Sequence, residues 1–232
     1  EHPGTLSVDA LARQILKPST RDGIEGQRVL NLLLGMSEDS GFWPSQVDVA
    51  EVSGLSRERI AELVTKTQNR WKKDSAITRL RTTIEELLQS AGGVASIREL
   101  SALLLVARGS VREEPMRSQV ALAVCRAAVE VERCMAEPRF HVRRDTHRVL
   151  IAQQHRFASY ASRLGDVADE IAAEDPLVTP ARAIETLRDV PLPEELPVLT
   201  ESRLLRLAAA SSTKAAVSSR QELYLRGLNA VR

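Results

Sequence analysis

The sequence predicts a mainly α-helical protein. Of its 232 residues, 43% are hydrophobic but only 3% are aromatic, so the cores must be built from Leu, Val, Ile and Ala. Ala and Leu favour helices, whereas sheets draw on β-branched and aromatic residues. Apolar residues recur at helical spacing in most segments, and one segment alternates as a clear hairpin. We therefore predict tandem helix-turn-helix and winged-helix units, with one small β-hairpin wing, followed by a helical C-terminal unit.

Four segments are expected from the positions of turns and prolines. They are an N-terminal helix and linker (1–23), a helix-turn-helix (24–74), a winged helix (75–155) and a helical C-terminal unit (156–232). Residues 5–17 form a short amphipathic helix that Pro18 ends. Because the chain opens without an initiator Met, we expect an excised piece of a longer protein, with this helix as the tail of something upstream.

The helix-turn-helix is predicted from the spacing of residues 45–63. A small residue, Ala50, falls where the first helix must let the second cross closely. Gly54 falls at the turn, where a positive φ is needed, and Ser56 is placed to cap the second helix. The buried positions are filled by apolar residues, namely Val49, Leu55, Ile60 and Leu63.

The polar side of the second helix is a candidate DNA-reading surface. It mixes phosphate-seeking and base-reading side chains, and the predicted contacts are Arg57, Arg59, Lys66, Asn69 and Arg70. Glu58 and Glu62 would repel phosphate if they faced it, so a solvated or protein-facing surface is the alternative. Trp71 is interpreted as a core residue rather than a platform for base stacking.

Residues 75–155 follow the order of a winged helix. A helix over 75–90 ends at a Gly pair (92–93), and a short strand at 94–95 leads to Ser96, which caps a helix over 97–107 with Glu99 placed as in a capping box. A long helix spans 116–135, and strands at 139–143 and 148–151 form a hairpin with a basic tip. Phosphate contact is predicted for Arg143, Arg144 and Arg148; an ordinary solvated hairpin is the alternative.

The C-terminal unit is predicted to be helical. Helices are expected over 157–173, 180–189 and 201–210, with an extended proline-containing connector over 191–197. Ser218 is interpreted as the cap of a final helix. The chain is expected to continue beyond Arg232.

Charge is segregated along the chain although its net value is only +1. Residues 57–81 hold eight basic and three acidic side chains, a net charge of +5. Residues 139–163 hold six arginines against one aspartate, again +5, whereas residues 166–201 hold ten acidic side chains against two arginines, −8. The basic stretches are candidate surfaces for a polyanion.

The sequence contains no pattern that predicts catalysis, a metal or a cofactor. It lacks a Gly-rich phosphate loop, HExxH, CxxC and GxSxG, and its four histidines and two cysteines make no zinc spacing. The cysteines, Cys125 and Cys134, are expected to be free thiols on one helix. No apolar run approaches a membrane span of about 18 residues. We expect a cytoplasmic protein with no membrane partner.

Several short segments of the sequence resemble those of a known family. Residues 43–46, 49–50, 54–57 and Ile60 are similar to the helix-turn-helix of primary sigma factors. Together with Arg70-Trp71, residues 92–94, 107–110, 137–140 and the C-terminal phrases 203–204, 218–220, 222–224 and 226–227, they resemble the region outside the kinase domain of the W-type serine/threonine kinase of phage-growth-limitation (BREX-like) defence systems. The resemblance implies a bacterial parent that phosphorylates Ser or Thr. The kinase signatures are missing from this chain, so no kinase residue can be assigned.

The sequence therefore predicts a non-catalytic region that binds or targets nucleic acid within a larger defence kinase. One alternative is a protein-interaction or autoregulatory scaffold, which docks other defence-system proteins or the parent's kinase domain. A second alternative is a fragment of a stand-alone transcription regulator.

Overall fold

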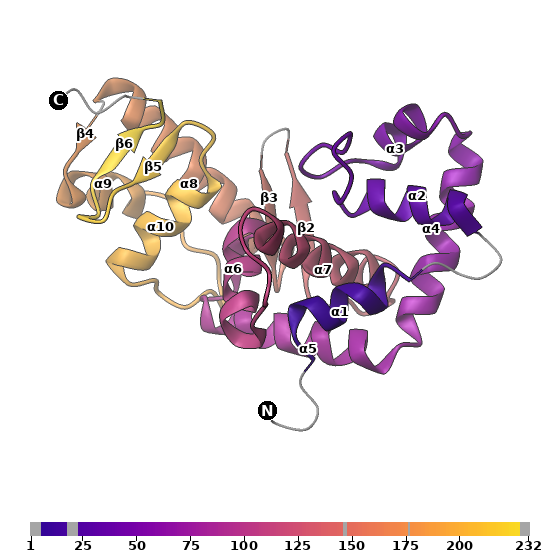
Figure 1. Ribbon diagram of the computed structural model, residues 1–232. Coiled ribbons are helices and arrows are strands. Elements are labelled where there is room, and N and C mark those ends of the chain that lie inside the picture. The colour runs from indigo at the N-terminus through magenta and orange to yellow at the C-terminus, as the bar shows by residue number, and fades with distance from the viewer. Residues whose placement is uncertain (1–5, 18–22, 146–147, 176, 228–232) are drawn as a thin grey trace. The chain divides into compact units, whose positions relative to one another are not determined.

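The computed structural model describes residues 6–17, 23–145, 148–175 and 177–227. These residues form ten helices and six short strands (Figure 1), which confirms the mainly α class. No described helix is long and apolar enough to cross a membrane. The helices are α1 (Val8–Ile15), α2 (Gly23–Leu33), α3 (Gln46–Ser53), α4 (Arg57–Lys72), α5 (Ser75–Ser90), α6 (Ile97–Arg108), α7 (Met116–Glu132), α8 (His155–Glu174), α9 (Pro180–Arg188) and α10 (Glu201–Ser211). The strands are β1 (Val94–Ser96), β2 (His141–Arg144), β3 (Val149–Ala152), β4 (Leu177–Val178), β5 (Ala215–Val217) and β6 (Leu223–Leu225).

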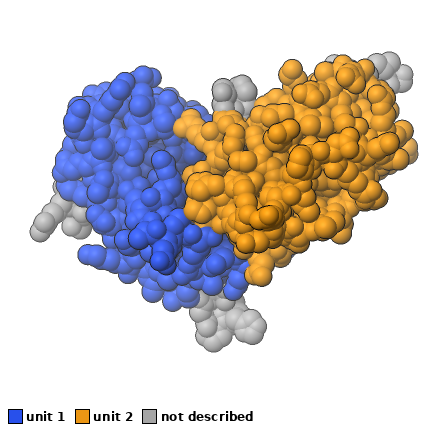
Figure 2. All heavy atoms as spheres, turned by 180° about the vertical axis from the view of Figure 1, so that it is seen from behind, with its two compact units in different colours: residues 1–87, 100–139 blue, residues 88–99, 140–232 orange. Residues whose placement is uncertain are grey.

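Internal contacts divide the chain into two compact units (Figure 2). Unit 1 holds residues 1–87 and 100–139, and unit 2 holds residues 88–99 and 140–232. The division passes through α5 and α6, because both helices supply residues to each unit. The four segments expected from the sequence remain a prediction about domains.

Helices α2, α3 and α4 of unit 1 form the predicted helix-turn-helix. Gly54 ends α3 with φ +75°, and its N–H donates to the carbonyl of Ala50 at 2.9 Å. Ser56 caps α4 by accepting the N–H of Arg59 at 3.2 Å. A small apolar core joins the three helices, with Leu55 packed against it; its buried members are Val29, Leu32, Leu33, Val49, Ala50, Ile60, Leu63 and Val64.

Helix α7 is the interior helix of unit 1. It packs against α1 and α4, and its residues from Val120 to Glu132 are buried apart from Leu122. The buried set includes three charged side chains, Arg126, Glu130 and Glu132, which are 3%, 2% and 1% exposed. Buried charges require partners, and the partners of these three side chains include residues of α4 and α5, the loop at 43–44 and the N–H of Arg139.

Each charged side chain of α7 meets a specific partner. Glu132 forms a buried ion pair with Arg81 of α5, 2.6 Å between Nε and Oε1, and accepts the N–H of Arg139 at 2.8 Å. Arg126 donates to the carbonyl of Pro44 and lies 4.5 Å from the ring centre of Trp43. Glu130 accepts a hydrogen bond from Gln68 of α4 at 3.2 Å and pairs with Arg126 at 3.6 Å.

Unit 2 contains two three-stranded antiparallel sheets with the same strand order. The first is β1-β3-β2, and the second is β4-β6-β5. Along the chain, α5-β1-α6-α7-β2-β3 is followed by α8-β4-α9-α10-β5-β6. Both series therefore run helix, strand, two helices and two strands, and in both the last strand lies between the other two. This element order is consistent with a winged-helix unit, and it occurs twice.

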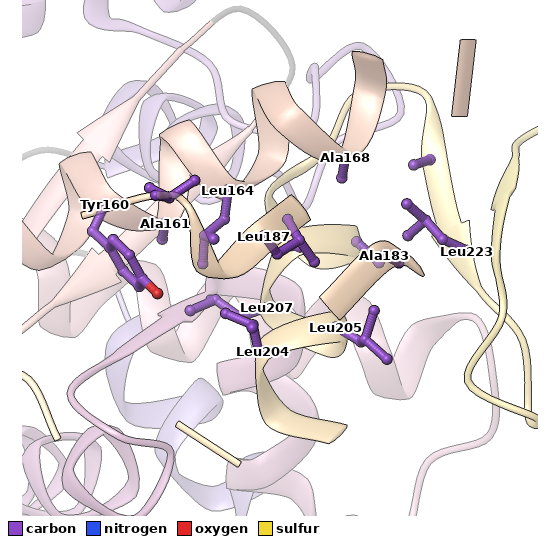
Figure 3. Packing of buried hydrophobic residues seen from close by; sticks show 14 of the residues in the cluster. Tyr160, Ala161, Leu164, Ala168, Ala183, Leu187, Leu204, Leu205, Leu207 and Leu223 are labelled. Carbon is purple, nitrogen blue, oxygen red and sulfur yellow. The ribbon is translucent and has the colours of Figure 1, made fainter. Parts of the chain in front are cut away.

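The second series supplies most of an apolar core of unit 2, to which Val94, Leu150 and Ala152 of the first sheet also belong. Figure 3 shows Leu164 of α8, Leu187 of α9, Leu205 of α10 and Leu223 of β6 in one cluster. Helices α8 and α10 cross closely at Gly165, where a Cβ would stand 2.1 Å from the carbonyl oxygen of Ser211. Only glycine permits that approach.

The final helix predicted to begin at Ser218 is wrong. The segment forms the hairpin β5–β6, whose central strand β6 pairs with both β4 and β5. The Ser218 hydroxyl accepts the backbone N–H groups of Arg220 and Glu222 at 3.2 and 3.1 Å, and Gln221 has φ +63°. A serine that caps a helix and one that closes a turn have the same local signature, so the sequence could not separate the two cases.

Asp169 of α8 fixes the start of that hairpin. Its carboxylate accepts hydrogen bonds from the Ser212 hydroxyl, from the Thr213 N–H and hydroxyl at 3.0 and 2.7 Å, and from the Lys214 N–H at 2.7 Å. Burial by itself would raise the pKa of Asp169, but these hydrogen bonds together outweigh it and lower the pKa from 3.8 to about 2.

Replacing Asp169 with Asn should destabilise unit 2 by about 1–2 kcal/mol, a value discounted for partial exposure. The folded-state pKa is depressed, so the carboxylate stabilises the protein fully above about pH 4, and this contribution is lost as the pH falls toward 2. Chemical denaturation at pH 7 and pH 2.5 tests this. The gap between wild type and Asp169→Asn should shrink at pH 2.5, and an equal gap at both pH values would contradict the assignment.

The two cysteines should report the burial of α7. Cys125 is fully buried, and desolvation raises the pKa of its thiol to about 12, whereas Cys134 just beyond the helix is exposed. Since the thiolate is the reactive form, a maleimide should modify one thiol in the folded chain and two after unfolding. Intact mass measures the number, and a Cys134→Ser chain should remain unmodified until it unfolds.

Candidate nucleic-acid interface

The two helices of the helix-turn-helix, α3 and α4, each begin at a side-chain cap. Ser45 and Asp48 form a reciprocal capping box at the start of α3, with N–H to side-chain distances of 3.1 and 2.6 Å. The Gly54 turn then directs the chain into α4, which Ser56 caps. Ile60, Leu63 and Val64 face the core, so the polar positions of α4 face outward.

The structure brings all five residues predicted on α4 to one helix, with different degrees of exposure. Arg57, Lys66 and Asn69 are exposed, whereas Arg59 and Arg70 are partly buried. The Arg70 guanidinium donates to the carbonyl of Ile15 at 3.4 Å. Arg57 is therefore the cation best placed for an external anion, and Arg70 also contacts α1.

A chain of ion pairs runs along this surface. Glu25 of α2 binds Arg59 (Oε1 to Nε, 2.7 Å), Arg59 binds Glu62 (Nη1 to Oε2, 2.8 Å), and the other carboxylate oxygen of Glu62 binds Lys66 at 2.7 Å. The hydrogen bonds from Lys66 and Arg59 lower the pKa of Glu62, and those to Glu62 and Glu25 raise the pKa of Arg59. The four side chains are 36–50% exposed, so solvent screens these pairs.

The start of α4 holds a second internal carboxylate. Glu58 accepts hydrogen bonds from its own backbone N–H and from the Ser56 hydroxyl, and both lower its pKa. The first turn of a helix attracts anions because its N–H groups lack helical partners. Glu58 thus occupies part of a position that an external phosphate would otherwise favour.

The inner side of α4 is anchored to unit 1 by two long-range hydrogen bonds. The indole N–H of Trp71 donates to the carbonyl of Ile15 at 3.3 Å, and Trp71 is 1% exposed, as expected for a core residue. Gln68 donates to Glu130 of α7 at 3.2 Å. These two hydrogen bonds fix the rotation of α4 about its axis, and therefore the direction of its outward face.

The basic hairpin belongs to unit 2, and its three predicted arginines differ in solvent exposure. Arg143 and Arg144 of β2 are exposed, and the tip residues 146–147 lie outside the described part of the chain. Arg148 is only 14% exposed; it donates to the carbonyls of Ser162 and Ser211 at 3.1 and 2.8 Å and pairs with Asp166 at 2.6 Å. Arg148 links the hairpin to α8 and α10, whereas Arg143 is an exposed cation that also donates to the Ser159 hydroxyl of α8 at 3.1 Å, and Arg144 is exposed.

The histidines form no described metal centre. His141 of β2 stacks on His155 of α8 with ring centres 4.0 Å apart. His147 lies outside the described residues. Within the described ranges, no group of three or more His, Cys, Asp or Glu side chains is arranged to hold a metal ion.

Sequence reasoning missed several residues that shape these surfaces. Glu25 lies 34 residues before Arg59, and Ser211 lies 63 residues after Arg148. Asp169, which orders the second hairpin, had no distinguishing local motif. Such partners are brought together by the fold, so no local spacing could indicate them.

The described residues form a mainly helical protein in which a helix-turn-helix precedes two series of helices and strands with the same strand order. No family model matches the chain. It is 32% identical over 257 residues to the protein named Probable kinase PglW of Streptomyces coelicolor, an alignment that covers 98% of this chain and 16% of the relative. The resemblance predicted from the sequence is thereby confirmed, and the chain corresponds to a limited part of that longer relative.

Replacing Arg148 with Ala should destabilise unit 2 by about 2–4 kcal/mol, because two carbonyls and the carboxylates of Asp145 and Asp166 lose a charged partner. Arg143→Ala is the matched control on the same hairpin, where an exposed side chain should cost less than about 1 kcal/mol. Denaturant unfolding of both variants measures the difference. Equal losses would contradict the positioning role of Arg148.

Proposed function

We propose that this chain is a non-catalytic nucleic-acid-binding region that targets a longer bacterial phage-defence protein. The observation that carries the proposal is the outward face of α4, where Arg57, Asn69 and Lys66, the last ion-paired with Glu62, are exposed on the second helix of a helix-turn-helix. In such motifs this helix reads the major groove, while cations bind the flanking phosphates. The similarity to a probable kinase of phage growth limitation supports a defence-related parent, and Ser/Thr phosphorylation is proposed for the remainder of that parent.

The basic hairpin supplies a second proposed contact. Arg143 and Arg144 are exposed at the end of β2, and Arg148 holds the hairpin on α8 and α10. A hairpin of this kind would bind phosphates without reading bases, so it would add affinity rather than sequence preference.

A protein-interaction or autoregulatory scaffold is the second candidate function, and the burial of α7 favours it. Helix α7 occupies the third-helix position of the first winged-helix series, the position that enters the major groove in DNA-binding examples. Here that helix is buried from Val120 onward. The first winged-helix series therefore cannot use it to read DNA, and partner docking on its other surfaces is the natural role for such a module.

The proposal predicts salt-dependent binding to a mixed-sequence DNA duplex. Fluorescence anisotropy across a salt series should give an affinity that falls log-linearly with salt concentration. The variant Arg57→Ala on α4 should lower the slope by about 1, because it removes one phosphate contact. Absence of binding by the wild-type chain at about 50 mM salt would overturn the proposal.

Two sets of control variants separate the surfaces. Arg206→Ala removes an exposed cation from α10 and should leave the slope unchanged. Arg143→Ala with Arg144→Ala tests the hairpin in the same series. Loss of slope in the hairpin variant but not in the α4 variant would move the interface from α4 to β2.

A further inference from the structure

We propose that Glu62 determines how selectively the α4 surface accepts nucleic acid, because it competes with phosphate for Arg59 and Lys66. This inference rests on the proposed nucleic-acid binding and concerns the same surface. The ligand class is a duplex phosphate backbone. In the free protein, Glu62 pairs with the two cations that a phosphate of this backbone would otherwise bind.

The geometry gives Glu62 this role. Its two carboxylate oxygens bind different cations, Oε2 meeting Arg59 Nη1 at 2.8 Å and Oε1 meeting Lys66 Nζ at 2.7 Å. Positions 59, 62 and 66 follow one another at spacings of three and four residues, so they lie along one side of the helix. A phosphate also presents several anionic oxygens that can bridge two such cations. It would need the same donors that Glu62 now holds.

Arg59 is restrained from a second side. Its Nε donates to Glu25 of α2 at 2.7 Å, so two of its donor groups serve carboxylates of the chain. Arg57 begins the helix outside this ion-pair chain and is exposed. The surface therefore contains one exposed cation outside the ion-pair chain, Arg57. It also contains two cations, Arg59 and Lys66, that an external anion can bind only by displacing Glu62.

Competition of this kind weakens chance contacts more than specific ones. A randomly placed duplex would meet the negative charge of Glu62 and gain little from cations that are already paired. A duplex in the right register can replace both ion pairs at once and add base contacts from Asn69, which is exposed on the same helix. The carboxylate thus raises the ratio of specific to non-specific affinity, the quantity that governs site choice on a genome.

The test uses Glu62→Gln, which keeps the length of the side chain but removes its charge. A mixed-sequence duplex should bind roughly five- to tenfold more tightly, because one repulsive charge is removed and two weak ion pairs are released. The salt slope should steepen by about 1 to 2 as Arg59 and Lys66 engage phosphates. Glu25→Gln should give a smaller gain because it releases only one bond of Arg59.

Glu51→Gln is the matched control. Glu51 is an exposed carboxylate on α3, and its replacement changes the net charge by the same amount without touching Arg59 or Lys66. It should alter affinity less than about twofold, since well-separated surface charges are largely screened. Thermal unfolding of all three variants checks that the chains remain folded.

The outcomes separate this inference from the proposed function. Tighter binding and a steeper slope for Glu62→Gln, with Glu51→Gln unchanged, would support it. If wild type binds and Glu62→Gln binds equally or more weakly, the inference is overturned while nucleic-acid binding stands; weaker binding would mean that Glu62 itself contacts a base amine. If neither protein binds at low salt, the proposed function fails and the inference fails with it.

Discussion

Burial of charge on α7 is the constraint on which unit 1 depends. Removing one partner from a buried ion pair leaves an uncompensated charge that costs several kcal/mol. Glu132 requires Arg81 of α5, and Glu130 accepts a hydrogen bond from Gln68 of α4. Apolar packing alone would tolerate small rotations of these helices, whereas directional partners do not. The outward face of α4 is therefore set by interactions on its opposite side.

Unit 2 uses charge differently, because its key groups bind backbone atoms. Arg203 of α10 donates to the carbonyls of Ala91 and Val94 and to the carboxylate of Glu99, each at 2.7 Å. Arg148 and Asp169 likewise engage carbonyls or N–H groups of loops and helix ends. These contacts stabilise connections that lack regular secondary structure. Arg148, Asp169 and Arg203 thereby connect the strands and loops of unit 2 to its helices.

Features with local physical causes were predictable from the sequence. The turn after α3 requires a left-handed backbone, which Gly54 permits, and Ser56 caps α4. The spacing of apolar residues indicates the small core. These local signals are why the two helices and their turn lie where the sequence predicted them. The second hairpin was missed because Ser218 closes a turn with a helix-cap signature. The restraint on Arg59 was missed because Glu25 lies on another helix. Glu62 was recognised as a charge but not as a bridge, since its pairing depends on side-chain geometry.

The recurrence of one strand order, β1-β3-β2 and then β4-β6-β5, has an evolutionary consequence. A fold copied within one chain keeps its apolar interior while its exposed positions are free to diverge. The first hairpin, residues 141–152, holds three arginines against one aspartate, a net charge of +2, whereas the second hairpin, residues 215–225, holds one arginine against one glutamate, a net charge of 0. Duplication of a single module followed by divergence of surface charge would produce this pattern. The array can then acquire a new partner without a new fold.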